Sequence, residues 1–235
     1  MFGNWFGRKG DTTKSGPFYR PYPDEAANHI YNLLFCDDPS LFSKDTPRGY
    51  LGVVLSDSID RETLDRIGND LDVESRTRVL AFNRLRAMKA SVPRKRLLGT
   101  IVEMPLHGGL DSLAIFLDHR LRYINHTGKM AIFESTPASL LAGVDDILRA
   151  SQFVVNRYGP WDKTRRPPPT GDLTRMTFLV SDGLYFGEGP ASDLLRDRFA
   201  APVLGAVGRL MPLLVDEALK IDRSNSRDAS QAPLD

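Results

Sequence analysis

Short apolar runs separated by turn signals occupy the middle of the chain, from Leu97 to Glu134. The three breaks between the four runs contain the turn-forming sequences HGG, DHR and NHTG. Because connections this short join neighbouring strands in antiparallel fashion, the pattern predicts a four-stranded meander. The run from Leu113 to Leu117 is apolar at every position, which predicts a central strand with both faces covered.

A second hairpin is predicted farther along the chain. Met176 to Val180 and Leu184 to Phe186 are short apolar runs, and Ser181, Asp182 and Gly183 form a turn signal between them. The glycines and proline of residues 187–190 are expected to end the second run. The sheet is therefore expected to contain about six strands.

Helical periodicity predicts the remaining elements. Apolar residues recur at helical spacing after Pro23, after Asp60, from Val73 to Met88, after Thr136 and from Pro202 onward. The run from Tyr50 to Leu55 is instead interpreted as a short strand. The predicted fold class is α+β, with an antiparallel meander sheet packed against several amphipathic helices.

The predicted division of the chain has four parts. Residues 1–22 form an irregular aromatic arm, residues 23–95 a helical N-terminal region, residues 96–221 the α+β core, and residues 222–235 a disordered polar tail. The arm is expected to pack on its own domain, since aromatic side chains carry large apolar area that needs burial. The alternative is an arm that binds a partner.

Charge argues against nucleic acid as a partner. The 235 residues include 31 basic and 30 acidic side chains, which leaves a formal net charge of +1. Nucleic-acid-binding proteins usually show a clear basic excess. The densest basic stretch is an arginine row, interpreted as a solvated helix face balanced by nearby acids; it comprises Arg76, Arg78, Arg84 and Arg86.

Compartment and cofactors follow from what the sequence lacks. Cys36 is the only cysteine, so no internal disulfide is expected. Neither a signal peptide nor a membrane-spanning run is recognised, and the predicted location is the cytoplasm. The glycines match no phosphate-binding pattern and the four histidines have no metal-ligand spacing, so no cofactor and no metal are predicted. The last helix and the aromatic arm are both candidates for a homo-oligomer interface.

The candidate functional region is the stretch from Gly159 to Pro190. It begins within a proline-rich segment, Asn156 to Gly171, which is predicted to be an ordered loop or a strap rather than a helix, and it ends in the second hairpin. Turn chemistry alone also explains this composition. The candidate binding residues are Trp161, Asp162, Lys163, Arg165, Asp182, Tyr185 and Glu188.

Two functions are compatible with this region. The first is a non-enzymatic binding protein that uses the surface from Trp161 to Glu188 for a protein or small-molecule partner. The second is a hydrolase or transferase in which Asp162, Asp182 and Glu188 provide acid and base groups. The second requires those carboxyl groups to converge in one cavity.

The chain resembles a group of uncharacterised bacterial proteins. The resemblance rests on the phrases GPWD, PPP and FLVSDGLYFGEGP, which occur here in that order, and it extends over roughly Leu97 to Met211. It implies a bacterial, cytoplasmic origin and keeps the region from Gly159 to Pro190 as the leading candidate. It implies no activity, cofactor or catalytic residue.

Overall fold

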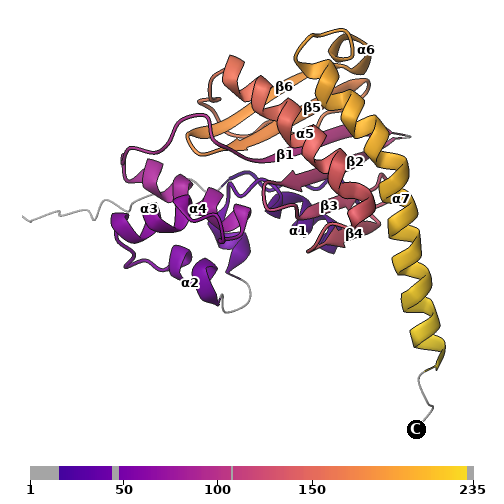
Figure 1. The fold of residues 1–235 in the computed structure, drawn as a ribbon, viewed down its shortest axis with the longest axis horizontal. Helices are drawn as coiled ribbons and strands as arrows, with labels where there is room; N and C mark the ends of the chain where they lie inside the picture. Colours follow the sequence, from indigo (N-terminus) through magenta and orange to yellow (C-terminus); the bar gives the residue numbers. More distant parts are fainter. Residues whose placement is uncertain (1–15, 44–47, 107, 232–235) are drawn as a thin grey trace, which may run out of the picture.

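The computed structural model describes residues 16–43, 48–106 and 108–231, with side chains up to residue 220. The predicted α+β class is confirmed. A six-stranded antiparallel sheet has the order β4-β3-β2-β1-β5-β6, and helices cover both of its faces (Figure 1).

The predicted meander forms one side of this sheet. Its strands are β1 (Leu97–Leu106), β2 (Gly109–Phe116), β3 (Leu121–Ile124) and β4 (Met130–Phe133). Strand β2 is buried from its second residue to its last, as the uninterrupted apolar run predicted. The second hairpin, β5 (Leu173–Val180) and β6 (Gly183–Pro190), joins on the other side of β1. Strand β6 is therefore an edge strand.

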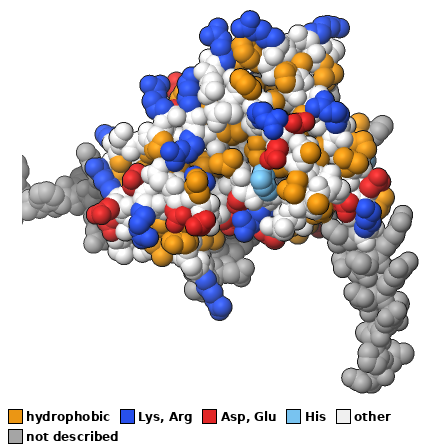
Figure 2. Space-filling model, viewed as in Figure 1, with side chains coloured by type: hydrophobic (Ala, Val, Ile, Leu, Met, Phe, Trp, Pro, Cys, Tyr) orange, Lys and Arg blue, Asp and Glu red, His pale blue; other side chains and the backbone are white. Residues whose placement is uncertain are grey.

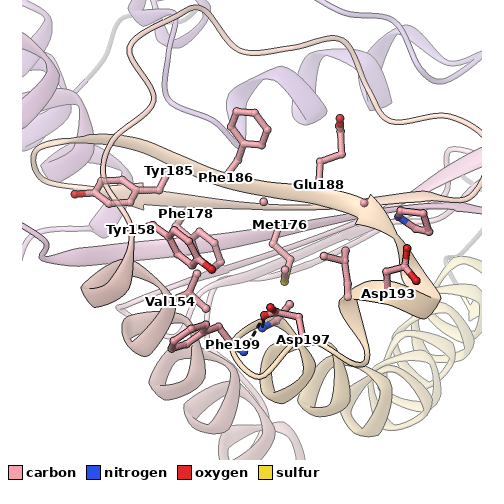
Figure 3. A pocket seen from close by; sticks show the side chains of 15 residues that line it. Val154, Tyr158, Met176, Phe178, Tyr185, Phe186, Glu188, Asp193, Asp197 and Phe199 are labelled. Carbon is pink, nitrogen blue, oxygen red and sulfur yellow. Dashed lines mark hydrogen bonds between the residues drawn. The ribbon is translucent and has the colours of Figure 1, made fainter.

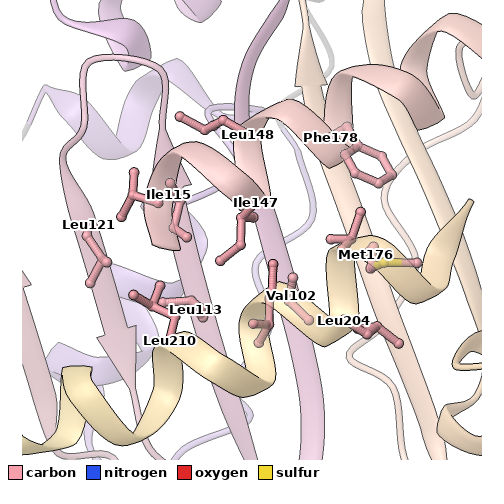
Figure 4. Packing of buried hydrophobic residues seen from close by; sticks show 14 of the residues in the cluster. Val102, Leu113, Ile115, Leu121, Ile147, Leu148, Met176, Phe178, Leu204 and Leu210 are labelled. Carbon is pink, nitrogen blue, oxygen red and sulfur yellow. The ribbon is translucent and has the colours of Figure 1, made fainter. Parts of the chain in front are cut away.

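One face of the sheet, called here the α5/α7 face, is covered by two long helices. Helix α5 (Ala138–Arg157) and helix α7 (Ala200–Gln231) pack side by side across it, and the short helix α6 (Ala191–Leu194) connects β6 to α7. The core beneath them is mainly apolar (Figure 4), and includes Val102, Leu113, Ile115, Ile147, Met176, Phe178, Leu204 and Leu210.

The opposite face, called here the N-terminal face, is covered by the helical N-terminal region. It contains α1 (Glu25–Leu33), the 3₁₀ helix η1 (Pro39–Phe42), α2 (Gly49–Leu55), α3 (Arg61–Asn69) and α4 (Ser75–Ala87). The strand predicted for Tyr50 to Leu55 is wrong, because these residues form α2. A short apolar run has too few residues for its periodicity to distinguish a strand from a helix.

The arm packs on its own domain where the structure describes it. Residues 1–15 lie outside the described residues. From Gly16 to Tyr22 the chain has no regular secondary structure. Tyr22 is buried and its hydroxyl donates to Ser112 Oγ at 2.8 Å, while the Tyr19 backbone N–H donates to Asn32 Oδ1 at 2.9 Å. These contacts fix the arm against α1 and the sheet.

The arginine row does not form a solvated helix face. Arg78 is buried and its Nε donates to the Gly68 carbonyl at 3.0 Å. Arg84 donates to the carbonyls of Val54 and Ser56. These side chains satisfy carbonyl groups at the ends of α2 and α3, which explains the row through contacts inside the protein. On the face shown in Figure 2, basic and acidic side chains are interspersed with hydrophobic ones.

The C-terminal tail also differs from its prediction. Residues 222–231 continue α7 as helix, and residues 232–235 lie outside the described residues. Figure 1 shows this end of α7 extending beyond the sheet. No glycine or proline occurs between Leu213 and Ala232, and adding residues to an existing helix costs far less than starting one. The low hydrophobicity of residues 222–231 therefore led to a wrong prediction of disorder for a segment that is helical.

Candidate functional site

The proline-rich segment forms an ordered strap, defined here as residues 159–171, between α5 and β5. It starts later than predicted, because Asn156 and Arg157 are the last residues of α5. It has no regular secondary structure apart from one β-bridge. At that bridge the Trp161 N–H donates to the Leu184 carbonyl at 2.7 Å, on the outer edge of β6. The Trp161 and Phe186 rings pack edge to face, with their centroids 4.8 Å apart. Lys163 Nζ lies 5.4 Å from the centroid of the Trp161 ring. Asp162 is exposed.

Arg165 has a structural role rather than a binding role. Its side chain is 2% exposed, and its Nε donates to Asp37 Oδ2 at 2.7 Å. Its NH2 donates to the Pro17 carbonyl and to Asn32 Oδ1. The guanidinium carbon lies 3.9 Å from the centroid of the Phe35 ring. Arg165 therefore fastens the strap to the N-terminal region.

Glu188 belongs to a buried charge network on the N-terminal face. Arg175 Nε donates to Glu188 Oε2 at 2.7 Å, and Arg166 NH1 lies 2.7 Å from Glu188 Oε1. Arg175 also lies 3.7 Å from Glu103, which accepts a 2.7 Å hydrogen bond from the Tyr31 hydroxyl. Burial raises the pKa of the Glu103 carboxyl, against the lowering effects of Tyr31 and Arg175. Both Glu188 oxygens are thus occupied by arginines.

Asp182 and Tyr185 lie at the turn end of the β5–β6 hairpin. Asp182 Oδ1 accepts from the Lys95 backbone N–H and from the Tyr185 hydroxyl, each at 3.1 Å. Burial and the neighbouring Asp182 carboxylate raise the pKa of Tyr185 to about 12. These bonds tie the hairpin turn to the chain that enters β1, and Tyr185 remains a neutral hydrogen-bond donor at ordinary pH.

The three acid/base candidates do not converge. Asp182 lies in the hairpin turn, whereas Glu188 lies six residues farther along, a distance of roughly 20 Å at the rise of an extended strand. Asp162 lies on the exposed strap. Within the described part of the chain, no group of three or more His, Cys, Asp or Glu side chains could hold a metal ion.

A pocket with a volume of about 520 Å³ lies on the α5/α7 face, beneath β6 (Figure 3). Its walls come from the end of α5, the β5–β6 hairpin and the chain from α6 into α7. Aromatic and aliphatic side chains dominate these walls, namely Val154, Tyr158, Met176, Phe178, Tyr185, Leu194 and Phe199. Figure 3 shows that Phe186 and Glu188 point to the opposite side of β6, so that these two residues line the pocket through their backbone.

Two glycines leave this space open. Gly187 and Gly189 alternate with Phe186 and Glu188, so they share the α5/α7 face of β6 with Tyr185. A Cβ atom built on Gly187 would meet no atom within 4 Å. The sequence analysis took these glycines as the end of the strand, but β6 continues to Pro190. Two glycines separated by one residue lie on the same face of a strand, and neither has a side chain to fill the space there. Their spacing was therefore the sequence signal for a vacancy on that face of β6.

The polar groups around the pocket are few and acidic. Asp193 and Asp197 line it, and the lining contains no lysine or arginine. Asp197 Oδ1 accepts the backbone N–H groups of Phe199 and Ala200, each at 2.8 Å, which lowers its pKa and caps the start of α7. Arg196 NH1 lies 3.3 Å from Asp193. Arg196 and the N-terminus of α7 thus balance these two carboxylates, and the apolar walls set the character of the pocket.

Comparisons with known proteins found no matching family model, no matching curated protein and no matching solved structure. No helix within the described ranges combines the length and apolarity needed to cross a membrane. The functional argument therefore depends on the geometry of the site.

Proposed function

We propose that this protein is a non-enzymatic binding protein whose site is the pocket beneath β6. The main observation behind the proposal is the empty space over Gly187, which belongs to a pocket with a volume of about 520 Å³ and mostly apolar walls. Cavities of this size with mostly apolar walls are typical of ligand sites. The site uses Tyr185 and the backbone of Glu188 from the region selected by sequence, but not Arg165.

The surroundings of the pocket support binding over catalysis. Glu188 is neutralised by two arginines, and Asp197 caps a helix. The Tyr185 hydroxyl is bonded to Asp182. Burial raises the pKa of the Cys36 thiol to about 12, so its thiolate is scarcely populated at neutral pH. These groups are held in structural contacts, and no observation favours the hydrolase or transferase alternative.

The proposed ligand carries a neutral aromatic or aliphatic group. Apolar walls favour such a group because its transfer from water is favourable, and no lysine or arginine of the lining is available to pair with an anion. We also propose a cytoplasmic setting and a bacterial origin. A buried free thiol at Cys36 and the resemblance described above support that setting.

The test uses the neutral fluorophore N-phenyl-1-naphthylamine and the full-length chain. The dye is expected to bind with enhanced emission, and Gly187→Val is expected to abolish binding because its side chain enters the pocket. The matched control is Gly208→Val on α7, where an added Cβ also meets no atom within 4 Å. Equal dye binding by wild type and Gly187→Val, or no binding by wild type, would refute the proposal.

A further inference from the structure

We infer that the natural occupant of this pocket is a large apolar side chain of an extended peptide from a partner protein, which adds to the sheet at the outer edge of β6. The inference depends on the binding function proposed above and specifies its ligand class. Extended peptides commonly bind by pairing with an exposed sheet edge, where main-chain hydrogen bonds provide affinity and pockets for alternate side chains provide specificity.

The first supporting observation is an open backbone edge. Strand β6 is last in the sheet order, and among the described residues only Trp161 pairs with its outer edge, at Leu184. Because successive residues of a strand direct their N–H and C=O groups to alternate sides, Phe186 and Glu188 direct theirs outward like Leu184. An unpaired edge of this kind is a template for another chain.

The strap already shows how a chain pairs at this edge. The bridge between Trp161 and Leu184 is antiparallel, with its N–H···O=C bond at 2.7 Å. Beyond it the free edge extends to Pro190, which has no N–H, and the Ala191 N–H then bonds to the Asp172 carbonyl. A segment of about five residues therefore has room to pair between these two limits.

The second supporting observation is that the pocket lies directly beneath this edge. Residues of an added strand alternate between the two faces of the sheet. A residue beside Gly187 on the α5/α7 face would direct its side chain toward the vacancy that Gly187 leaves. A single bound peptide would thus pair its backbone with β6 and insert one side chain into the pocket.

A second copy of the same strand does not fit this role. Symmetric pairing of β6 with β6 would present Tyr185, Gly187 and Gly189 to the pocket of the other copy. The glycines have no side chain to insert, and Tyr185 is buried in its own core with its hydroxyl bonded to Asp182. The unpaired edge and the apolar walls instead fit an extended peptide from another protein that carries one large apolar side chain.

The experiment selects phage-displayed random heptapeptides on the full-length chain and then measures the affinity of synthetic copies. The expected motif has one large apolar residue, and Gly187→Val is expected to weaken binding by about tenfold or more, with Gly208→Val unchanged. N-methylation of the peptide nitrogens that face β6 should abolish binding, whereas N-methylation of the alternate nitrogens should not.

Hydrogen exchange measured by NMR provides the site-specific check. The peptide is expected to slow exchange at the amides of Phe186 and Glu188. Protection of these two amides in the free chain would overturn the inference, because the edge would already be occupied. Peptide binding that is insensitive to Gly187→Val or to the pattern of N-methylation would also overturn it.

The dye experiment separates the two proposals. If the fluorophore binds wild type but not Gly187→Val and no peptide is enriched, the peptide inference is wrong and the binding function stands. If neither the dye nor a peptide binds, both proposals are wrong.

Discussion

The two faces of the sheet bury different kinds of side chains. The N-terminal face buries charges, with Arg165, Glu103 and Arg175 held by partners from distant parts of the chain. The α5/α7 face has a mainly apolar core with no buried ion pair among the described residues, but it leaves a pocket at the β6 edge. The difference indicates that the charged groups, although they look reactive in the sequence, hold the strap, whereas the apolar vacancy is where a ligand fits.

The largest effect is expected from breaking the charged anchor of the strap. Arg165→Ala should lower the free energy of unfolding by about 3–5 kcal/mol, because it leaves the half-buried Asp37 carboxylate without its cation and removes the packing on Phe35. Urea denaturation measures this change. Lys163→Ala, at an exposed cation of the same strap, should change stability by less than about 0.5 kcal/mol. Equal effects of the two variants would contradict a structural role for Arg165.

The second largest loss of stability is expected from disturbing the contact between the strap and the turn of the β5–β6 hairpin. Gly183 has a φ of +151°, and an added Cβ would lie 2.8 Å from Pro160 Cβ. Gly183→Ala should therefore destabilise the protein by about 1–3 kcal/mol. Gly159→Ala, where an added Cβ meets no atom within 4 Å, is the control for thermal denaturation. A neutral Gly183→Ala would show that the strap and turn adjust independently.

Stability should also depend on pH through Glu103. Because burial raises its folded-state pKa above the usual 4.5, the folded protein retains this proton to higher pH than the unfolded chain does. Wild type should thus lose stability relative to Glu103→Gln as pH rises from 4.5 through the folded-state pKa, by about 1.4 kcal/mol for each unit of pKa difference. Urea denaturation of both proteins across this range is the measurement. A difference that stays constant with pH, or changes in the opposite direction, would contradict the burial effect.

The smallest effect is expected on the pocket side. Gly187→Val should raise the free energy of unfolding by about 0.5–1 kcal/mol, because a glycine within a strand costs conformational entropy and the new side chain meets open space. Denaturation in the absence of ligand measures this gain. A loss of more than about 1 kcal/mol would show that the space over Gly187 is already filled.

Local patterns were sufficient to predict the sheet. The apolar run of β2 and the turn at Asp182 and Gly183 depend on residues adjacent in sequence, so the meander and the second hairpin followed from them. The pairing of β5 with β1 joins distant segments and was not predicted. Helix α2 and the end of α7 were missed for the opposite reason. Helix α2 has too few residues to show a helical period of apolar positions. The end of α7 is helical because it continues a helix that begins more than twenty residues earlier.

The candidate site was predicted only in part. Tyr185 was correctly placed on a strand that borders the pocket, whereas Glu188 was expected to follow the end of that strand and lies within it, with its side chain pointing away from the pocket. Arg165 was misread because its partner Asp37 lies 128 residues away, a relation that no local pattern contains. The pocket itself depends on how α6 and α7 return over β6. It was not predicted from the sequence, and the spacing of Gly187 and Gly189 was the local signal that could have indicated it.

The most direct test of the account is methyl NMR on chain labelled at its methionine methyl groups, titrated with N-phenyl-1-naphthylamine. Met176 lines the pocket, whereas Met88 is partly buried and packs against the core of the N-terminal face. The account predicts that the Met176 signal shifts, that the Met88 signal does not, and that Gly187→Val abolishes the response. A Met176 signal that is unchanged by the dye, or that still shifts in Gly187→Val, would contradict it.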